Sequence, residues 1–343
     1  MLRYIKKLLL RFLVLCIIAG AAIAFLAWHD YSRFLQTPLD IPPEGVVFEI
    51  PRGASVAAVA RELESRRLIS EAGWLRIHAR LGYQEKSIKA GEYKLLPGLT
   101  PETLLTLFVS GKTIDYSITL IEGWNFKQMM TEIEAHPILQ QTLSGLSGEA
   151  IMQKLGHGDE HPEGRFFPDT YSFPRNTTDL EVLRRAYEKM SRVLQDAWAR
   201  RDENIQLKSP YEALILASIV EKETGTAGER AEISGVFSRR LRKGMKLQTD
   251  PTVIYGMGDR YKGNIRRKDL KEDTPYNTYV HTGLPPTPIC MPGADAIAAA
   301  VQPKAGKSLY FVAKGDGSHQ FSNTLRQHTV SYTHLRAHET LRS

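Results

Sequence analysis

The sequence predicts an α+β protein in three parts: a single N-terminal transmembrane helix, a small α/β module, and a larger domain of mixed helices and strands. Three observations support this prediction. An uncharged apolar run near the N-terminus has the length of a membrane span. Short strand-like and helical patterns alternate over residues 46–111, and mainly helical patterns follow over residues 112–330. The 343 residues, 42% hydrophobic and 24% charged, have a globular composition and exclude a disordered or fibrous chain.

Residues 1–30 are predicted to be a cytoplasmic stub followed by a membrane anchor. The span would run from Leu8 to Trp28, with Arg11 reaching back to the interface, and it is about as long as a membrane helix requires. Residues 1–11 hold four basic residues and no acidic one, which places the N-terminus in the cytoplasm and exports the rest. A cleaved signal peptide is the alternative, because Ala22-Ile-Ala24 resembles a cleavage site. The apolar run continues past that site, which favours a retained anchor.

The net charge of +7 suggests a nucleic-acid partner, but most of it lies at the ends of the chain. Residues 1–11 carry four of the seven charges, and residues 331–343 carry one. An exported domain that is close to neutral has little attraction for nucleic acid, so no such partner is predicted. The two cysteines exclude a disulfide framework and a four-cysteine zinc site.

The proline-rich residues 31–45 are predicted to be a stiff, extended linker, and residues 46–111 a compact module. The module contains a strand from Val46, two helices, a second strand near residues 88–95, and a third helix capped by Thr100. This strand–helix–helix–strand order resembles a LysM-like module, a carbohydrate-binding fold. A spacer without a ligand site is the alternative.

The larger domain, residues 112–330, contains one sharply defined helix over about residues 210–224. Ser209 and Glu212 form a capping box, and the run from Ala213 to Val220 is apolar except for Ser218, so the helix should be buried. Glu221 follows directly. Desolvation and the negative end of the helix dipole should both favour its protonated form, which suits a proton donor for glycosidic bond cleavage.

The neighbouring glutamate, Glu223, points to a different face of this helix. It is expected to pair with a nearby cation, either Arg230 or Lys222.

Segments that combine amide, hydroxyl and tyrosine side chains follow the next helix, over about residues 229–243. Sugars are bound by such a mixture of hydrogen-bonding groups and flat aromatic faces. Together with Ser218 and Glu223, the candidate substrate contacts or supporting residues are Gln248, Thr249, Asp250, Tyr255, Tyr276, Asn277 and Tyr279.

Several motifs occur in an order that resembles the YceG-like endolytic murein transglycosylases. They are EGRFFPDTY at 163–171, ASIVEKET at 217–224, LQTDPTVIYG at 247–256, YNTY at 276–279, GLPP at 283–286 and YFVA at 310–313. The similarity covers nearly all of residues 1–328, including the anchor and the LysM-like module.

The resemblance implies lytic cleavage of peptidoglycan within its glycan strands, at the bond between N-acetylmuramic acid and N-acetylglucosamine. The catalytic glutamate of the family falls on Glu221, which would act first as acid and then as base and leave a 1,6-anhydro end. The resemblance implies no cofactor, a bacterial plasma membrane location with the catalytic domain outside the cytoplasm, and coupling to glycan-polymerising synthases.

Two alternatives remain open at this point. A muramidase-type hydrolase would need a second carboxylate, which could be Asp250 or Glu223. A non-catalytic wall-binding scaffold would use its glutamate only for structure. No metal site is predicted, because the loop at residues 156–163 holds ligand-type residues without the helical His-Glu-x-x-His spacing.

Two features depart from the family pattern. Cys290-Met291 stands where a more polar pair is expected, which puts the contacts of that loop in doubt. Residues 331–343 have no family character, and we expect them to be a non-native tail in place of the final helix with which such chains usually continue.

Overall fold

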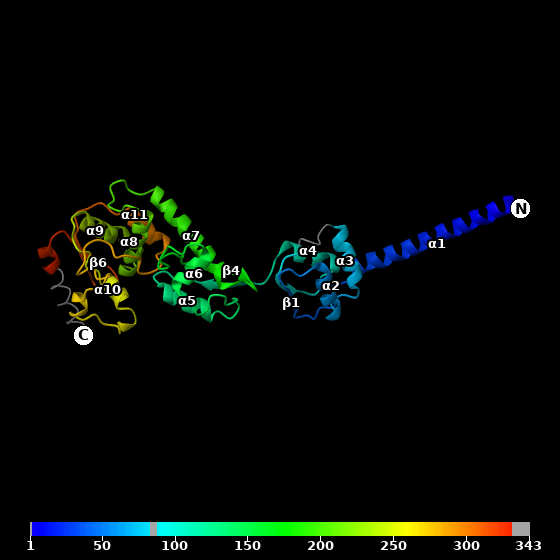
Figure 1. Cartoon of the computed structure of the whole chain (residues 1–343), viewed down its shortest axis with the longest axis horizontal. Helices are drawn as coiled ribbons and strands as arrows, with labels where there is room; N and C mark the ends of the chain where they lie inside the picture. Colours follow the sequence, from blue (N-terminus) through cyan, green and yellow to red (C-terminus); the bar gives the residue numbers. More distant parts are fainter. Residues whose placement is uncertain (1, 83–87, 331–343) are drawn as a thin grey trace. The chain divides into compact units, whose positions relative to one another are not determined.

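The computed structural model describes residues 2–82 and 88–330, and these residues form two units (Figure 1). The first unit contains the residues up to Tyr116 together with Phe173–Asn176. The second contains Ser117–Ser172 and the residues from Thr177 onward. Helices and short two-stranded sheets occur together, which confirms the predicted mixed α+β fold. The LysM-like assignment of the module stays a prediction.

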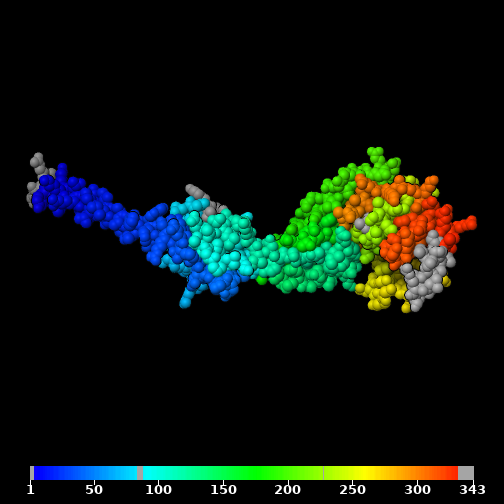
Figure 2. Space-filling view, turned by 180° about the vertical axis from the view of Figure 1, so that it is seen from behind, coloured from blue at the N-terminus to red at the C-terminus, as the bar shows by residue number. Residues whose placement is uncertain are grey.

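Helix α1 (Leu2–Gln36) contains the predicted span and is unbroken over 35 residues. Its apolar stretch is long enough to cross a membrane, and none of that stretch is buried against other parts of the chain. Figure 2 shows its N-terminal length, in dark blue, uncovered by the rest of the first unit. The helix ends just before Thr37-Pro38, because proline disfavours a helical residue ahead of it.

The predicted extended linker of residues 31–45 is wrong in its first part, since residues 31–36 continue α1. Phe34, in this last turn, is buried in the core of the first unit together with Leu39 and Ile41. These tertiary contacts stabilise helix where proline content alone predicts an extended chain.

The rest of the first unit packs three helices against one two-stranded antiparallel sheet. Strands β1 (Val46–Ile50) and β2 (Gly91–Leu95) pair antiparallel, with Val46 opposite Leu95. The helices are α2 (Val56–Ser65), α3 (Ala72–Leu81) and α4 (Pro101–Ser110). As predicted, Thr100 caps α4 through its hydroxyl.

The core of the first unit is centred on three aromatic rings from β1, β2 and α4. Phe108 lies with its ring centroid 4.8 Å from Tyr93 and 5.8 Å from Phe48, and all three side chains are buried. The Tyr93 hydroxyl donates to the Lys89 and Phe108 carbonyls, at 2.7 and 3.2 Å. The polar tip of the tyrosine is therefore satisfied inside the core.

The second unit is mainly helical and is built around one buried helix. Helix α8 (Pro210–Glu223) is buried continuously from Ala213 to Val220 and contacts α7, α9, α10 and α11. Strands β3 (Asp115–Thr119) and β4 (Thr170–Pro174) belong to this unit only in part, because residues up to Tyr116 and from Phe173 to Asn176 are in the first unit. The other elements are α5 (Phe126–Ala135), α6 (Gly148–Leu155), α7 (Asp179–Ala199), α9 (Arg230–Arg242), α10 (Asp250–Met257), α11 (Ala294–Val301), β5 (Tyr310–Ala313) and β6 (His319–Ser322). Strand β3 pairs with β4, and β5 pairs antiparallel with β6.

The start of α8 follows the prediction in part. The Ser209 hydroxyl accepts from the Glu212 amide at 3.2 Å, and Pro210 occupies the first turn. The Glu212 carboxylate accepts from the Lys208 amide instead of the Ser209 amide, so only one half of the predicted capping box forms. The helix ends at Glu223, and Thr224 is its C-terminal cap.

The aromatic core predicts a large stability effect at Phe108. Replacing Phe108 by alanine should destabilise the first unit by about 3–5 kcal/mol, because it leaves a cavity between the Phe48 and Tyr93 rings. Urea unfolding of the detergent-solubilised chain, followed by hydrogen exchange in β1 and β2, measures this change. The control Leu96→Ala, at a side chain 50% exposed, should alter stability little; equal losses for the two variants would refute this account of the core.

Candidate active site

The second unit contains a cavity of about 990 Å³ beside the C-terminal end of α8. Its walls come from the first turns of α5 and α6, from the EGRFFPDTY loop, from α10 and from the segment after it. Residues that line it include Gly123, Phe126, His161, Glu163, Lys222, Tyr255, Tyr261, Tyr276 and Ile289. A concave site of this size, with aromatic and polar walls, can accommodate sugar units.

Glu163 contributes a carboxylate to this cavity. It accepts the Phe126 amide at 3.0 Å, at the start of α5, and the Tyr255 hydroxyl at 2.9 Å. Only 3% of the residue is exposed, and burial raises the pKa of Glu163 to about 7 although these hydrogen bonds oppose the shift. The sequence prediction missed Glu163 as a site residue, even though it begins a quoted motif.

Two of the predicted sugar-contacting residues lie side by side on the cavity wall. The rings of Tyr255 and Tyr276 meet edge to face, with centroids 4.8 Å apart. The Tyr276 hydroxyl lies 2.8 Å from the Thr287 hydroxyl, so both tyrosines are held in place by hydrogen bonds. Their predicted contact with sugar stays a prediction.

Glu221 is placed at the end of α8 with partners that the sequence did not predict. Its side chain is 7% exposed, and its carboxylate lies 3.3 Å from Arg230 and accepts the Gly293 amide at 2.9 Å. Both contacts stabilise a charged carboxylate. Residues outside α8, and not only the apolar helix and its dipole, therefore form the surroundings of Glu221.

A second carboxylate, Glu122, lies close to Glu221. Burial and then the charge of Glu221 raise the pKa of Glu122. A Cβ atom at Gly293 would collide with the Glu122 carboxylate, so a larger residue there would require this carboxylate to move. The two residues next in the chain, Gly123 and Lys222, line the cavity, and the Lys222 ammonium donates to the Gly123 carbonyl at 3.3 Å. The pair of acids thus adjoins the cavity wall.

Glu223 belongs to a different cluster. It accepts from the Thr249 hydroxyl, and burial raises the pKa of Glu223 to about 7. The expected pairing of Glu223 with Arg230 or Lys222 is wrong, because successive side chains leave a helix about 100° apart. Arg230 faces Glu221 instead, and Lys222 faces the cavity.

The remaining predicted residues surround this cluster or brace loops. The Tyr279 hydroxyl donates to Asp250 at 2.6 Å, and Gln248 is exposed, with a left-handed φ of 49°. The Asn277 amide group donates to the Asp269 and Glu272 carbonyls and is 1% exposed, so it braces its own loop.

Ser218 is buried and holds a loop onto α8. Its hydroxyl donates to the Ile215 carbonyl at 2.7 Å and accepts the Ile289 amide at 3.0 Å. Cys290 and Met291 continue this loop and are both fully buried, so their apolar character suits their position.

Comparisons with known proteins identify the family of this chain. A family model described as the YceG-like family matches residues 48–333. The chain belongs to the YceG-like family. It is 32% identical over 317 residues to an endolytic murein transglycosylase of Bacillus subtilis, covering 87% of each chain. It is 26% identical to an endolytic murein transglycosylase of Streptococcus pneumoniae, covering 95% of this chain and 64% of that protein.

A solved structure is also similar to this YceG-like chain. It is the crystal structure of a yceG-like protein from Listeria monocytogenes, with a TM-score of 0.54 and 30% identity. The similarity covers 84% of this chain and 99% of the other. The predicted non-native tail, residues 331–343, lies outside the described residues.

The loop at residues 156–163 of this YceG-like chain has structural contacts in place of metal-ligand geometry. The His157 ring stacks on Tyr187 at 4.1 Å, and His161 accepts the Glu163 amide at 3.2 Å. Within residues 2–82 and 88–330, no group of three or more histidine, cysteine or acidic side chains is arranged to hold a metal.

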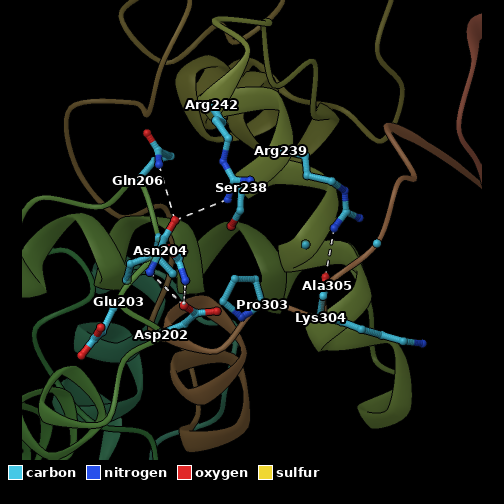
Figure 3. A pocket seen from close by; sticks show the side chains of 13 residues that line it. Asp202, Glu203, Asn204, Gln206, Ser238, Arg239, Arg242, Pro303, Lys304 and Ala305 are labelled. Carbon is cyan, nitrogen blue, oxygen red and sulfur yellow. Dashed lines mark hydrogen bonds between the residues drawn. The ribbon is translucent and has the colours of Figure 1, made fainter.

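A second polar cavity, of about 670 Å³, is lined by the segment that precedes α8, by α9, and by the segment after α11 (Figure 3). The two arginines from α9 bind backbone carbonyls there. Arg239 donates to Ser308 at 2.7 Å and to Lys304 at 2.9 Å, and Arg242 donates to Asn204 at 3.4 Å. These contacts join chain segments, and Glu221 does not line this cavity.

The raised pKa of Glu223 predicts a pH-dependent stability. Between about pH 4.5 and pH 7 the folded chain keeps a proton that the unfolded chain releases, so stability falls as pH rises through this window. The glutamine in Glu223→Gln is neutral at every pH in this window. The variant should therefore lack this fall in the free energy of unfolding, which is at most about 3 kcal/mol. Thermal unfolding from pH 4 to pH 8 measures the difference.

The exposed Glu132 provides the matched control, since Glu132→Gln should leave the pH profile of stability unchanged. Glu163→Gln should flatten the profile as Glu223→Gln does, because burial shifts both groups in the same direction. A Glu223→Gln profile that coincides with wild type would show that this carboxylate titrates normally in the folded chain.

Proposed function

We propose that this chain is a membrane-anchored endolytic murein transglycosylase, a lyase that cleaves peptidoglycan within its glycan strands. The observation that carries the proposal is Glu221, a nearly buried carboxylate at the end of α8 that adjoins a cavity with two tyrosines. The names of the Bacillus and Streptococcus relatives support the same activity.

Glu221 acts twice in the proposed reaction. Its carboxylic acid first protonates the oxygen between N-acetylmuramic acid and N-acetylglucosamine, and the bond from that oxygen to the muramyl C1 breaks. The muramyl C6 hydroxyl oxygen then bonds to C1, and its proton returns to the Glu221 carboxylate. The products are a free hydroxyl on the glucosamine side and a 1,6-anhydro ring, and no water is consumed.

The surroundings of Glu221 support both steps. Arg230, at 3.3 Å, and the Gly293 amide stabilise the carboxylate that forms when the proton leaves. Glu122 is a second carboxylate beside Glu221, and burial together with the charge of Glu221 raises the pKa of Glu122.

The glycan is proposed to occupy the 990 Å³ cavity, with sugar rings against Tyr255 and Tyr276. Gln248, Asp250 and Tyr279 are proposed as further contacts. Helix α1 would span the bacterial plasma membrane with its basic end in the cytoplasm, which places both units outside it. Coupling to peptidoglycan synthases belongs to the same proposal.

A muramidase-type hydrolase is the second candidate, because Glu163 places another carboxylate on the cavity wall. The alternatives named from sequence fit less well. Glu223 accepts from the Thr249 hydroxyl, and Asp250 accepts from the Tyr279 hydroxyl, so both carboxylates are engaged outside the cavity wall. Both candidate reactions cleave the same bond, and they differ in whether water enters the product.

Replacing Glu221 by glutamine should reduce strand cleavage by a factor of at least about 10³, because an amide neither donates nor accepts the required proton. Mass spectrometry of products from purified glycan strands measures the loss. Glu232 lies on α9 and forms an ion pair with Lys304, so Glu232→Gln, which removes only that contact, should cleave as wild type does. Cleavage by Glu221→Gln at the wild-type rate would remove this residue from the mechanism.

Reaction in ¹⁸O-labelled water distinguishes the two candidate reactions. A lyase should give 1,6-anhydro ends without the label, because the C6 hydroxyl is the nucleophile. A hydrolase would give reducing ends that carry one labelled oxygen. Labelled reducing ends as the main product would replace the proposed reaction with hydrolysis.

A further inference from the structure

Helix α3 of the first unit leaves large apolar side chains uncovered. Ile77 and Leu81 are 44% and 65% exposed, while Leu75 and Ala79 on the opposite side are buried in the core. Positions 77 and 81 are four residues apart, so they share one face of the helix. Exposed apolar side chains that form one contiguous face, larger than scattered single residues, can mark a contact surface.

This apolar face is continuous with the membrane-proximal part of α1. The Trp74 ring lies 5.5 Å from the Tyr31 ring, which lies 5.8 Å from the Trp28 ring at the end of the predicted span. The Tyr31 hydroxyl and the His78 ring nitrogen are 2.8 Å apart. Helix α3 is therefore fixed to α1 within one helical turn of the span, at the end of the first unit where α1 joins it (Figure 1).

The charge on α3 also fits a lipid surface. Its ten residues include two exposed arginines, Arg76 and Arg80, and no acidic residue. Arginines that flank aliphatic and aromatic side chains are typical of helices that lie in the headgroup layer of a membrane. Tryptophan and tyrosine rings, as at Trp28 and Tyr31, favour the same layer.

We propose that α3 lies in the headgroup layer of the membrane that α1 spans, with Ile77 and Leu81 inserted and the arginines against lipid phosphates. This inference rests on the proposed membrane anchoring. Its consequence is that the first unit sits directly on the bilayer, because α1 continues without a break from the span into the core at Phe34. The first unit then has a fixed height above the lipid.

Fluorescent labelling of the full chain in vesicles tests this proposal. In a Cys16→Ser background, Leu81→Cys or Ile77→Cys is labelled with an NBD fluorophore, and Cys290 is buried and does not compete. Val47→Cys, at an apolar side chain 50% exposed on β1, is the matched control. The vesicles contain phosphatidylethanolamine and phosphatidylglycerol, with or without headgroup-region nitroxide lipids.

We expect the probes at residues 77 and 81 to emit at shorter wavelength and to be quenched by the nitroxide lipids, whereas the probe at residue 47 stays aqueous. Aqueous emission from residue 81 in chains that float with the vesicles would overturn the proposal. So would short-wavelength emission without lipid quenching, which would indicate a protein partner or a second copy. Chains that fail to float would instead contradict the anchoring.

Discussion

The burial of α8 on all sides is the constraint on which the second unit depends. A helix that is buried from Ala213 to Val220 needs other helices around it, and its charged residues lie only before and after this run. Glu221, Lys222 and Glu223 directly follow it, and helix geometry sends them in three directions. Glu221 contacts Arg230 and the Gly293 amide, Lys222 lines the cavity, and Glu223 binds the Thr249 hydroxyl.

Local signals explain what the sequence could predict. Proline in the first turn, a serine cap and an apolar run define α8, and Thr100 caps α4. Tertiary contacts explain the errors. The helical conformation of residues 31–36 depends on the burial of Phe34. Arg230 pairs with Glu221, and not with Glu223, because of how α9 packs against α8. No local pattern encodes such packing.

At the candidate site, too, composition predicts which residue types are present, whereas packing determines which of them reach the cavity. Amides, hydroxyls and tyrosines suggested sugar binding, yet the same groups also brace loops, because both tasks need hydrogen-bond donors and acceptors. Asn277 binds carbonyls of its own loop, whereas Tyr255 reaches Glu163 across 92 positions of sequence. Only the fold separates these cases, and it adds Glu163, whose partners lie on two other elements.

The polar contacts of Glu221 give the proposed mechanism a physical basis that burial alone would not. A carboxyl group held neutral only by an apolar wall donates a proton poorly, because the wall destabilises the carboxylate that remains. Arg230 and the Gly293 amide stabilise the carboxylate that remains when the proton has left Glu221. A Cβ atom at Gly293 would meet the Glu122 carboxylate, so a side chain there would displace that neighbouring acid.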